Sequence, residues 1–130
     1  VHQPIDEGYA GGTCPNRHRA RAIIEEANRR AGWKKVVACF QGHLHIDGYE
    51  ERRGVHYFRM NSSSYAWVGE QYGRMAPYDR SLFAFVTVGD GHIKVEGRSG
   101  KWKDTSPAQR GVPGAEHFSA SIDSHDLSLR

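Results

Sequence analysis

The chain has 130 residues, with 18 basic and 15 acidic side chains and a formal net charge of +3 when histidine is neutral. This length suits one compact domain and excludes a machine of several domains. The basic residues are scattered in pairs rather than gathered in one stripe, which argues against a dedicated nucleic-acid binder. No apolar run reaches the ~20 residues that a membrane-crossing helix needs, so no membrane partner is expected.

The first predicted element is a strand end followed by a loop. Val1 to Ile5 is typical of the end of a buried strand, and the chain starts without Met. We therefore expect a piece of a longer protein. Glycine and proline punctuate residues 7–15, which predicts a loop.

An amphipathic helix is predicted from Arg17 to Arg30, with charged side chains on the face opposite the apolar one. Thr13 and Asn16 are both candidates for its N-cap, and Gly32 stands where a C-cap is expected. The apolar residues that recur at helical spacing are Ala20, Ile23, Ile24, Ala27 and Ala31.

Four strands are predicted after the helix. Lys35–Phe40 is a short β-branched run of the kind that is buried on both faces, and a helix that leads into such a strand indicates an α/β unit. Val55–Met60, Ser81–Val88 and His92–Glu96 follow, the last two joined by a Gly-Asp-Gly turn. We expect these three to form an antiparallel set at the edge of a sheet.

The texture of the sequence changes after Gly100. Residues 101–130 are rich in serine, glycine and proline, with Trp102 and Phe118 as their only aromatic residues. This composition predicts an extended or partly disordered tail on the body of the protein rather than a second domain.

Three histidines are placed where they could act together. His43 and His45 stand two residues apart directly after a buried strand, so in extended backbone both would point to one side. Gly42 leaves room for a sharp turn and for a ligand. His2 also follows a predicted strand end. Imidazole nitrogens are good donors to zinc, manganese and iron, so the pattern predicts a metal site.

Other catalytic arrangements find less support. Ser62-Ser63-Ser64 lacks the Gly-x-Ser-x-Gly elbow of a serine hydrolase. Cys14 and Cys39 are too few for a disulfide scaffold, and whether they pair or remain two buried thiols stays open.

The order of these motifs resembles the C-terminal half of the calcineurin-like metallophosphoesterase family. Val1-His2-Gln3-Pro4 is similar to the family's isolated histidine, and Gly42-His43-Leu44-His45 to its Gly-His-x-His block. The string from Gly54 to Ser64 and the hairpin over 82–96 are similar to its last strands. The resemblance covers about residues 1–100, and it implies that Asn61 and Ser62–Ser64 lie near the site.

The resemblance implies a fold, a reaction and a set of metal ligands. The fold would be α/β, the C-terminal part of a layered α/β/β/α sandwich over 1–100 with a tail over 101–130. His2 and His43 would bind one divalent ion of a pair, and His45 the other, the ions being manganese, iron or zinc. The substrate would be a phosphate mono- or diester.

The family's Asp-x-His, Gly-Asp-x-x-Asp and Gly-Asn-His-(Asp/Glu) blocks do not occur in these residues. The resemblance therefore implies a fragment, inactive by itself, whose partner is the missing N-terminal half of the same domain.

The alternative is a small non-catalytic binding module in which the histidines are incidental. Its contact patch would comprise Tyr57, Tyr65, Trp67 and Tyr72, although the same aromatic residues also suit a protein core.

Overall fold

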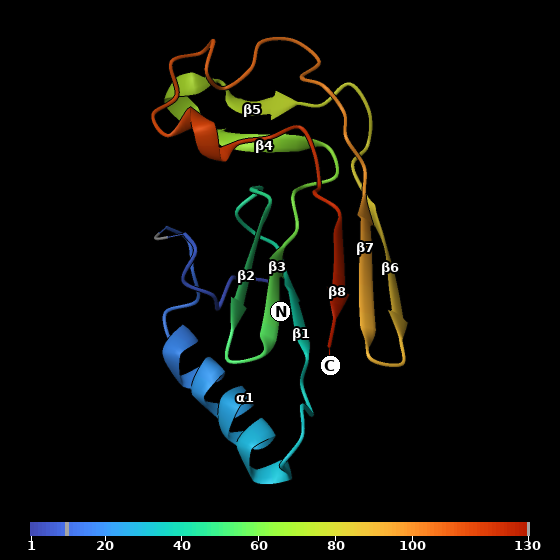
Figure 1. The fold of residues 1–130 in the computed structure, drawn as a ribbon. Coiled ribbons are helices and arrows are strands. Elements are labelled where there is room, and N and C mark those ends of the chain that lie inside the picture. The colour runs from blue at the N-terminus through green and yellow to red at the C-terminus, as the bar shows by residue number, and fades with distance from the viewer. Residues whose placement is uncertain (10, 130) are drawn as a thin grey trace. The chain divides into compact units, whose positions relative to one another are not determined.

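The fold is mixed α/β, mostly sheet with one α-helix (Figure 1). The structure is a computed structural model and describes residues 1–9 and 11–129. No helix among these residues is long and apolar enough to cross a membrane. The elements in chain order are α1 (Arg17–Ala31), β1 (Ala38–Gln41), β2 (Gly48–Arg52), β3 (Val55–Arg59), β4 (Tyr65–Gly69), the 3-10 helix η1 (Glu70–Tyr72), β5 (Arg74–Pro77), β6 (Ala84–Gly89), β7 (His92–Gly97), the 3-10 helix η2 (Ala115–His117) and β8 (His125–Ser128).

The chain divides into two compact units. The first comprises Val1–Leu44 and Gly48–Met60, and the second His45–Asp47 and Asn61–Arg130. The division falls inside the range 1–100 that the sequence assigns to one domain. Each unit is described by itself.

In the first unit, β3 is the central strand of a three-stranded sheet in the order β1-β3-β2. β1 runs parallel to β3, and β2 runs antiparallel to it through a tight turn at Arg53 and Gly54, which both have positive φ. Ile5, Val55 and Tyr57 form the core cluster, against which Ala20 and Ile24 of α1 pack. Burial of these apolar side chains is what holds the helix to the sheet.

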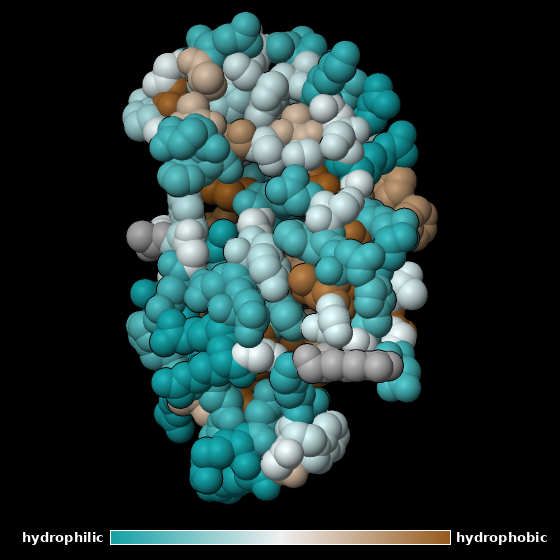
Figure 2. All heavy atoms as spheres, in the orientation of Figure 1, coloured by the Kyte–Doolittle hydropathy of each residue, from teal (hydrophilic) through white to brown (hydrophobic). Residues whose placement is uncertain are grey.

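The helix confirms the predicted position and corrects the predicted faces. It spans Arg17–Ala31, and Gly32 caps it in the left-handed conformation, with φ of 70°. Asn16 is the N-cap residue, but its side chain caps no backbone N–H. Arg21 is the buried residue of the helix, whereas Ile23 is 62% exposed. Hydrophilic atoms cover most of α1 in Figure 2.

The predicted antiparallel set is wrong in its composition. β3 pairs with β1 and β2, whereas β6 and β7 form a hairpin extended by β8 in a separate sheet of the second unit. The second unit also holds the two-stranded sheet β4-β5. Local spacing identified the strands, but their partners are chosen by long-range packing, which no local pattern encodes.

The segment from residue 101 onward is built into the second unit. β8 pairs antiparallel with β7 over residues 125–128, and Pro107, Val112 and Ile122 are buried. Asn61 donates hydrogen bonds to the carbonyl oxygens of Ser119 at 2.8 Å and Ser121 at 3.1 Å. The described part of this segment therefore differs from the extended or partly disordered tail that its composition predicted.

Candidate functional site

The chain turns sharply where β1 ends. β1 is a parallel strand, and its carboxyl end leads into Gly42, His43 and Leu44. His43 has φ of 73° and His45 has φ of 55°, both in the left-handed region. The prediction that extended backbone points both imidazoles to one side is therefore wrong. The position of His43 just after the carboxyl end of a parallel strand is as predicted, and open α/β sheets place their ligands there.

His2 lies beside His43. The amino group of Val1 donates to the carbonyl oxygen of Phe40 at 3.0 Å, and the N–H of Gly42 donates to the carbonyl oxygen of His2 at 2.9 Å. These bonds hold the first residues along the outer edge of β1. Nε2 of His2 lies 3.0 Å from Nδ1 of His43, and the ring centroids are 4.9 Å apart at 78°. Both histidines are exposed, so an ion or a substrate can reach them.

His45 belongs to the second unit. Its ring lies edge-on to Tyr65, with ring centroids 4.9 Å apart at 69°. Of the three predicted ligands, the structure thus brings together His2 and His43 and describes His45 in other surroundings.

Nε2 of His2 and Nδ1 of His43 are at hydrogen-bond distance from each other, and the same spacing also fits one divalent ion. Two nitrogens bound at about 2.1 Å and at right angles are about 3.0 Å apart, close to the observed separation. In the part of the chain that the structure describes, no group of three or more His, Cys, Asp and Glu side chains is arranged to hold an ion. The pair therefore supplies two imidazole donors, and a complete coordination shell needs further ligands.

The first unit also contains a buried polar cluster that the sequence did not predict. Asp6 is fully buried and forms an ion pair with Arg59. Gly8 and Gly48 lie against the guanidinium group of Arg59, and a Cβ atom at either would overlap it. Burial is the largest influence on the pKa of Asp6 and raises it, with Arg59 acting in the opposite direction. Gln41, the last residue of β1, is 2% exposed in the same region.

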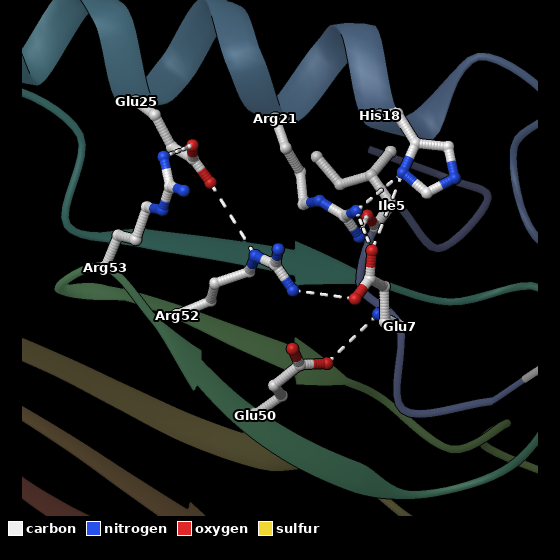
Figure 3. Close-up of polar contacts among 8 residues, drawn as sticks. All are labelled: Ile5, Glu7, His18, Arg21, Glu25, Glu50, Arg52 and Arg53. Atoms are coloured by element: carbon white, nitrogen blue, oxygen red, sulfur yellow. Dashed lines mark hydrogen bonds and ion pairs between the residues drawn. The ribbon is translucent and has the colours of Figure 1, made fainter.

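A second polar network joins α1 to the N-terminal segment and to β2 (Figure 3). The buried Arg21 donates to the carbonyl oxygen of Ile5 at 2.8 Å and forms an ion pair with Glu7. Glu7 also pairs with Arg52, at 2.6 Å. Figure 3 shows Arg21 reaching from the helix, and Arg52 from the sheet, toward Glu7. The network explains why a basic residue faces inward from a helix predicted to bury only apolar side chains.

Residues 61–64, which the resemblance places near the site, have structural contacts. Asn61 is buried, and its Oδ1 atom accepts hydrogen bonds from the N–H of Ser62 and the hydroxyl of Tyr78, each at 2.8 Å. Together with the bonds that it donates to Ser119 and Ser121, both the nitrogen and the oxygen of the Asn61 side-chain amide form hydrogen bonds.

The two cysteines are free thiols. Both pack against the core cluster of the first unit, and burial raises the pKa of Cys39. The question that the sequence left open is therefore answered in favour of two thiols in this structure.

No family model, no curated protein and no solved structure matches the chain. What the site can do therefore follows from its own donor atoms, burial and contacts.

Proposed function

We propose that the chain is the C-terminal part of a metal-dependent phosphoesterase of the calcineurin-like type. It would hydrolyse a phosphate mono- or diester at a two-metal centre. The approach of His2 to His43 carries the proposal, because two residues 41 positions apart have ring nitrogens 3.0 Å from each other. The two rings converge just after the carboxyl end of a parallel strand, which is where open α/β sheets place their ligands.

In this proposal His2 and His43 hold one ion, and the resemblance assigns His45 to the second. A pair of manganese, iron or zinc ions, when bound, polarises a phosphoryl group and activates water for in-line attack. The chain's own part would be to present two imidazoles, with Nε2 of His2 and Nδ1 of His43 as the donor atoms to the ion. Neutral donors bind the ion without cancelling the positive charge that attracts a phosphate ester.

The remaining ligands would come from an N-terminal half of the same domain, carrying the family's aspartate and asparagine blocks. In the described residues, two imidazoles at one point are too few donors for a two-metal centre. The layered α/β/β/α sandwich is likewise part of the proposal, since it would be completed by that half.

The test starts from the open reading frame that contains these residues. We expect the Asp-x-His, Gly-Asp-x-x-Asp and Gly-Asn-His-(Asp/Glu) blocks upstream of Val1, in that order. The encoded protein should hydrolyse p-nitrophenyl phosphate or its bis ester with Mn²⁺. His43→Ala and His45→Ala should each abolish most of this activity, whereas His117→Ala, an exposed histidine of η2, should leave it unchanged. Wild-type rates in the first two variants would refute the proposal.

The alternative, a non-catalytic binding module, is supported by one exposed apolar pair. Trp67 of β4 and Met75 of β5 are cross-strand neighbours, and each is 47% exposed. Tyr57 belongs to the core of the first unit and cannot be part of such a patch. A start codon directly before Val1, together with failure of the chain to bind Zn²⁺ or Mn²⁺, would favour this module over the enzyme.

A further inference from the structure

The segment that carries His2 is held in place by backbone contacts along its length. The carbonyl oxygen of Pro4 accepts from the N–H of Cys14 at 2.9 Å. The N–H of Ile5 donates to Oε1 of Gln41 at 2.6 Å, and the carbonyl oxygen of Ile5 accepts from Arg21 at 2.8 Å. Residues 4–5 therefore have fixed partners in the loop before α1, in α1 itself and in β1.

Among these partners, Gln41 is the closest in sequence to His43. It precedes His43 by two residues, and its side chain holds the backbone of Ile5, which follows His2 by three residues. Two short stretches of chain thus connect one carboxamide to both imidazoles. The N–H of Gly42, the residue after Gln41, also donates to the carbonyl oxygen of His2, so the two segments are joined by a second hydrogen bond.

The oxygen of the Gln41 carboxamide is oriented by its bond to the N–H of Ile5, and the buried Asp6 lies near the same side chain. Gln41 interacts with the carboxylate of Asp6 through its side chain and acts against the rise in Asp6 pKa that burial causes. The carboxamide oxygen faces the N–H of Ile5, whereas Nε2 of Gln41 and Oδ1 of Asp6 are buried without a hydrogen-bond partner among residues 1–9 and 11–129. Asp6 is in turn fixed by its ion pair with Arg59.

We propose that Gln41 is a positioning residue, whose buried carboxamide sets the place of His2 relative to His43 by holding the N–H of Ile5. The proposal rests on the proposed function for its relevance to metal binding, but the positioning itself is a property of the metal-free chain. A partner that orients a metal ligand without touching the ion typically changes metal affinity by about 10–100-fold when it is removed.

The test uses two readouts on the whole 130-residue chain. The first is the nuclear Overhauser effect between the ring protons of His2 and His43 without metal. The second is Zn²⁺ affinity by calorimetry. Gln41→Ala should lose the first and weaken the second about 10–100-fold. If folded Gln41→Ala keeps both, the proposal is wrong.

Asn28→Ala is the matched control. Asn28 also holds backbone through a carboxamide, accepting from the N–H of Val36 at 2.8 Å and donating to its carbonyl oxygen at 2.9 Å. Asn28 lies in α1, and Val36, which it holds, precedes the first residue of β1, at the end of the strand opposite to His43. This variant should retain the contact between the rings and the zinc affinity even where its fold is less stable.

If Gln41→Ala does not fold, a pair of substitutions at Gln41 and Asp6 tests the positioning role. Gln41→Glu alone places a second carboxylate against Asp6 and should lose the contact between the rings. Adding Asp6→Asn restores one carboxylate and one amide, and should recover that contact. A folded double variant that lacks it would overturn the proposal. If the contact follows these expectations while no variant and no wild-type chain binds Zn²⁺, positioning holds and the proposed metal site fails.

Discussion

The hydroxyl of Tyr78 donates a hydrogen bond of 2.8 Å to Oδ1 of Asn61, and both residues are buried. Tyr57 is also buried, but its hydroxyl has no hydrogen-bond partner among residues 1–9 and 11–129. The two tyrosines therefore differ in what their hydroxyl groups contribute to folding.

Removing the two hydroxyl groups should have different effects on stability. Tyr78→Phe should lower the free energy of unfolding by about 0.5–1.5 kcal/mol, because it deletes a satisfied hydrogen bond. Tyr57→Phe should leave it unchanged or raise it by up to about 1 kcal/mol, because an unpaired hydroxyl is costly to bury. Amide hydrogen exchange, followed in the unit that holds each residue, measures both. A loss of equal size in the two variants would contradict this difference.

Alkaline pH should destabilise the protein through the same residues. Burial raises the pKa of Tyr57 and of Tyr78 to about 12. Since an unfolded tyrosine ionises near pH 10, the stability gained by burying the neutral phenol is complete below about pH 10. It is lost as the pH rises through about 12. In urea titrations over this interval, wild type should lose stability more steeply than Tyr57→Phe. Parallel curves would show that burial does not raise the pKa of Tyr57.

The packing of the C-terminal segment on β7 can be tested at a glycine. A Cβ atom on Gly97 would lie 1.9 Å from the carbonyl oxygen of Ile122, a backbone atom that cannot move aside cheaply. Gly97→Ala should therefore lower the free energy of unfolding by about 1–3 kcal/mol. Gly89→Ala is the control, because nothing lies within 4 Å of a Cβ there. Similar urea midpoints for the two variants would mean that the segment does not pack as described.

Features that depend on neighbours in sequence were predictable. The 3.6-residue spacing of apolar side chains placed the helix over 17–30, and it spans Arg17–Ala31. Gly-Asp-Gly over 89–91 marked the turn between β6 and β7 correctly. In these cases the conformation that the local sequence prefers is also the one in the folded protein, so tertiary contacts did not alter the predicted position of the helix or of the turn.

Features that depend on distant partners were missed. β2 has the polar sequence Gly-Tyr-Glu-Glu-Arg, which lacks the apolar alternation of a strand. It is a strand because it pairs with β3. Asp6 and Arg59 are 53 residues apart, and no spacing rule connects them. At the candidate site, the strand before His43 was predictable, but the left-handed conformations of His43 and His45 were not, since non-glycine residues seldom adopt them.

The buried carboxyl group of Asp6 gives the pH dependence of folding a definite sign. Burial, the largest influence, raises its pKa above the ordinary value, and the nearby Glu50 acts in the same direction while Arg59 and Gln41 oppose it. The folded state therefore holds the Asp6 proton more tightly than the unfolded state does. This contribution to stability is present below the unfolded pKa and is lost as the pH rises through the raised value.

Asp6→Asn should remove that dependence. The variant leaves the guanidinium of Arg59 without its carboxylate and should be less stable than wild type, but the difference should shrink as the pH rises from about 4, near the ordinary aspartate pKa, toward neutrality. Asp79→Asn provides the opposite case: the backbone N–H of Lys101 and the side chain of Arg80 lower the Asp79 pKa. Its difference from wild type should grow with pH from below the ordinary aspartate pKa. Urea titrations at a series of pH values measure both slopes, and slopes of the same sign would show that burial does not govern Asp6.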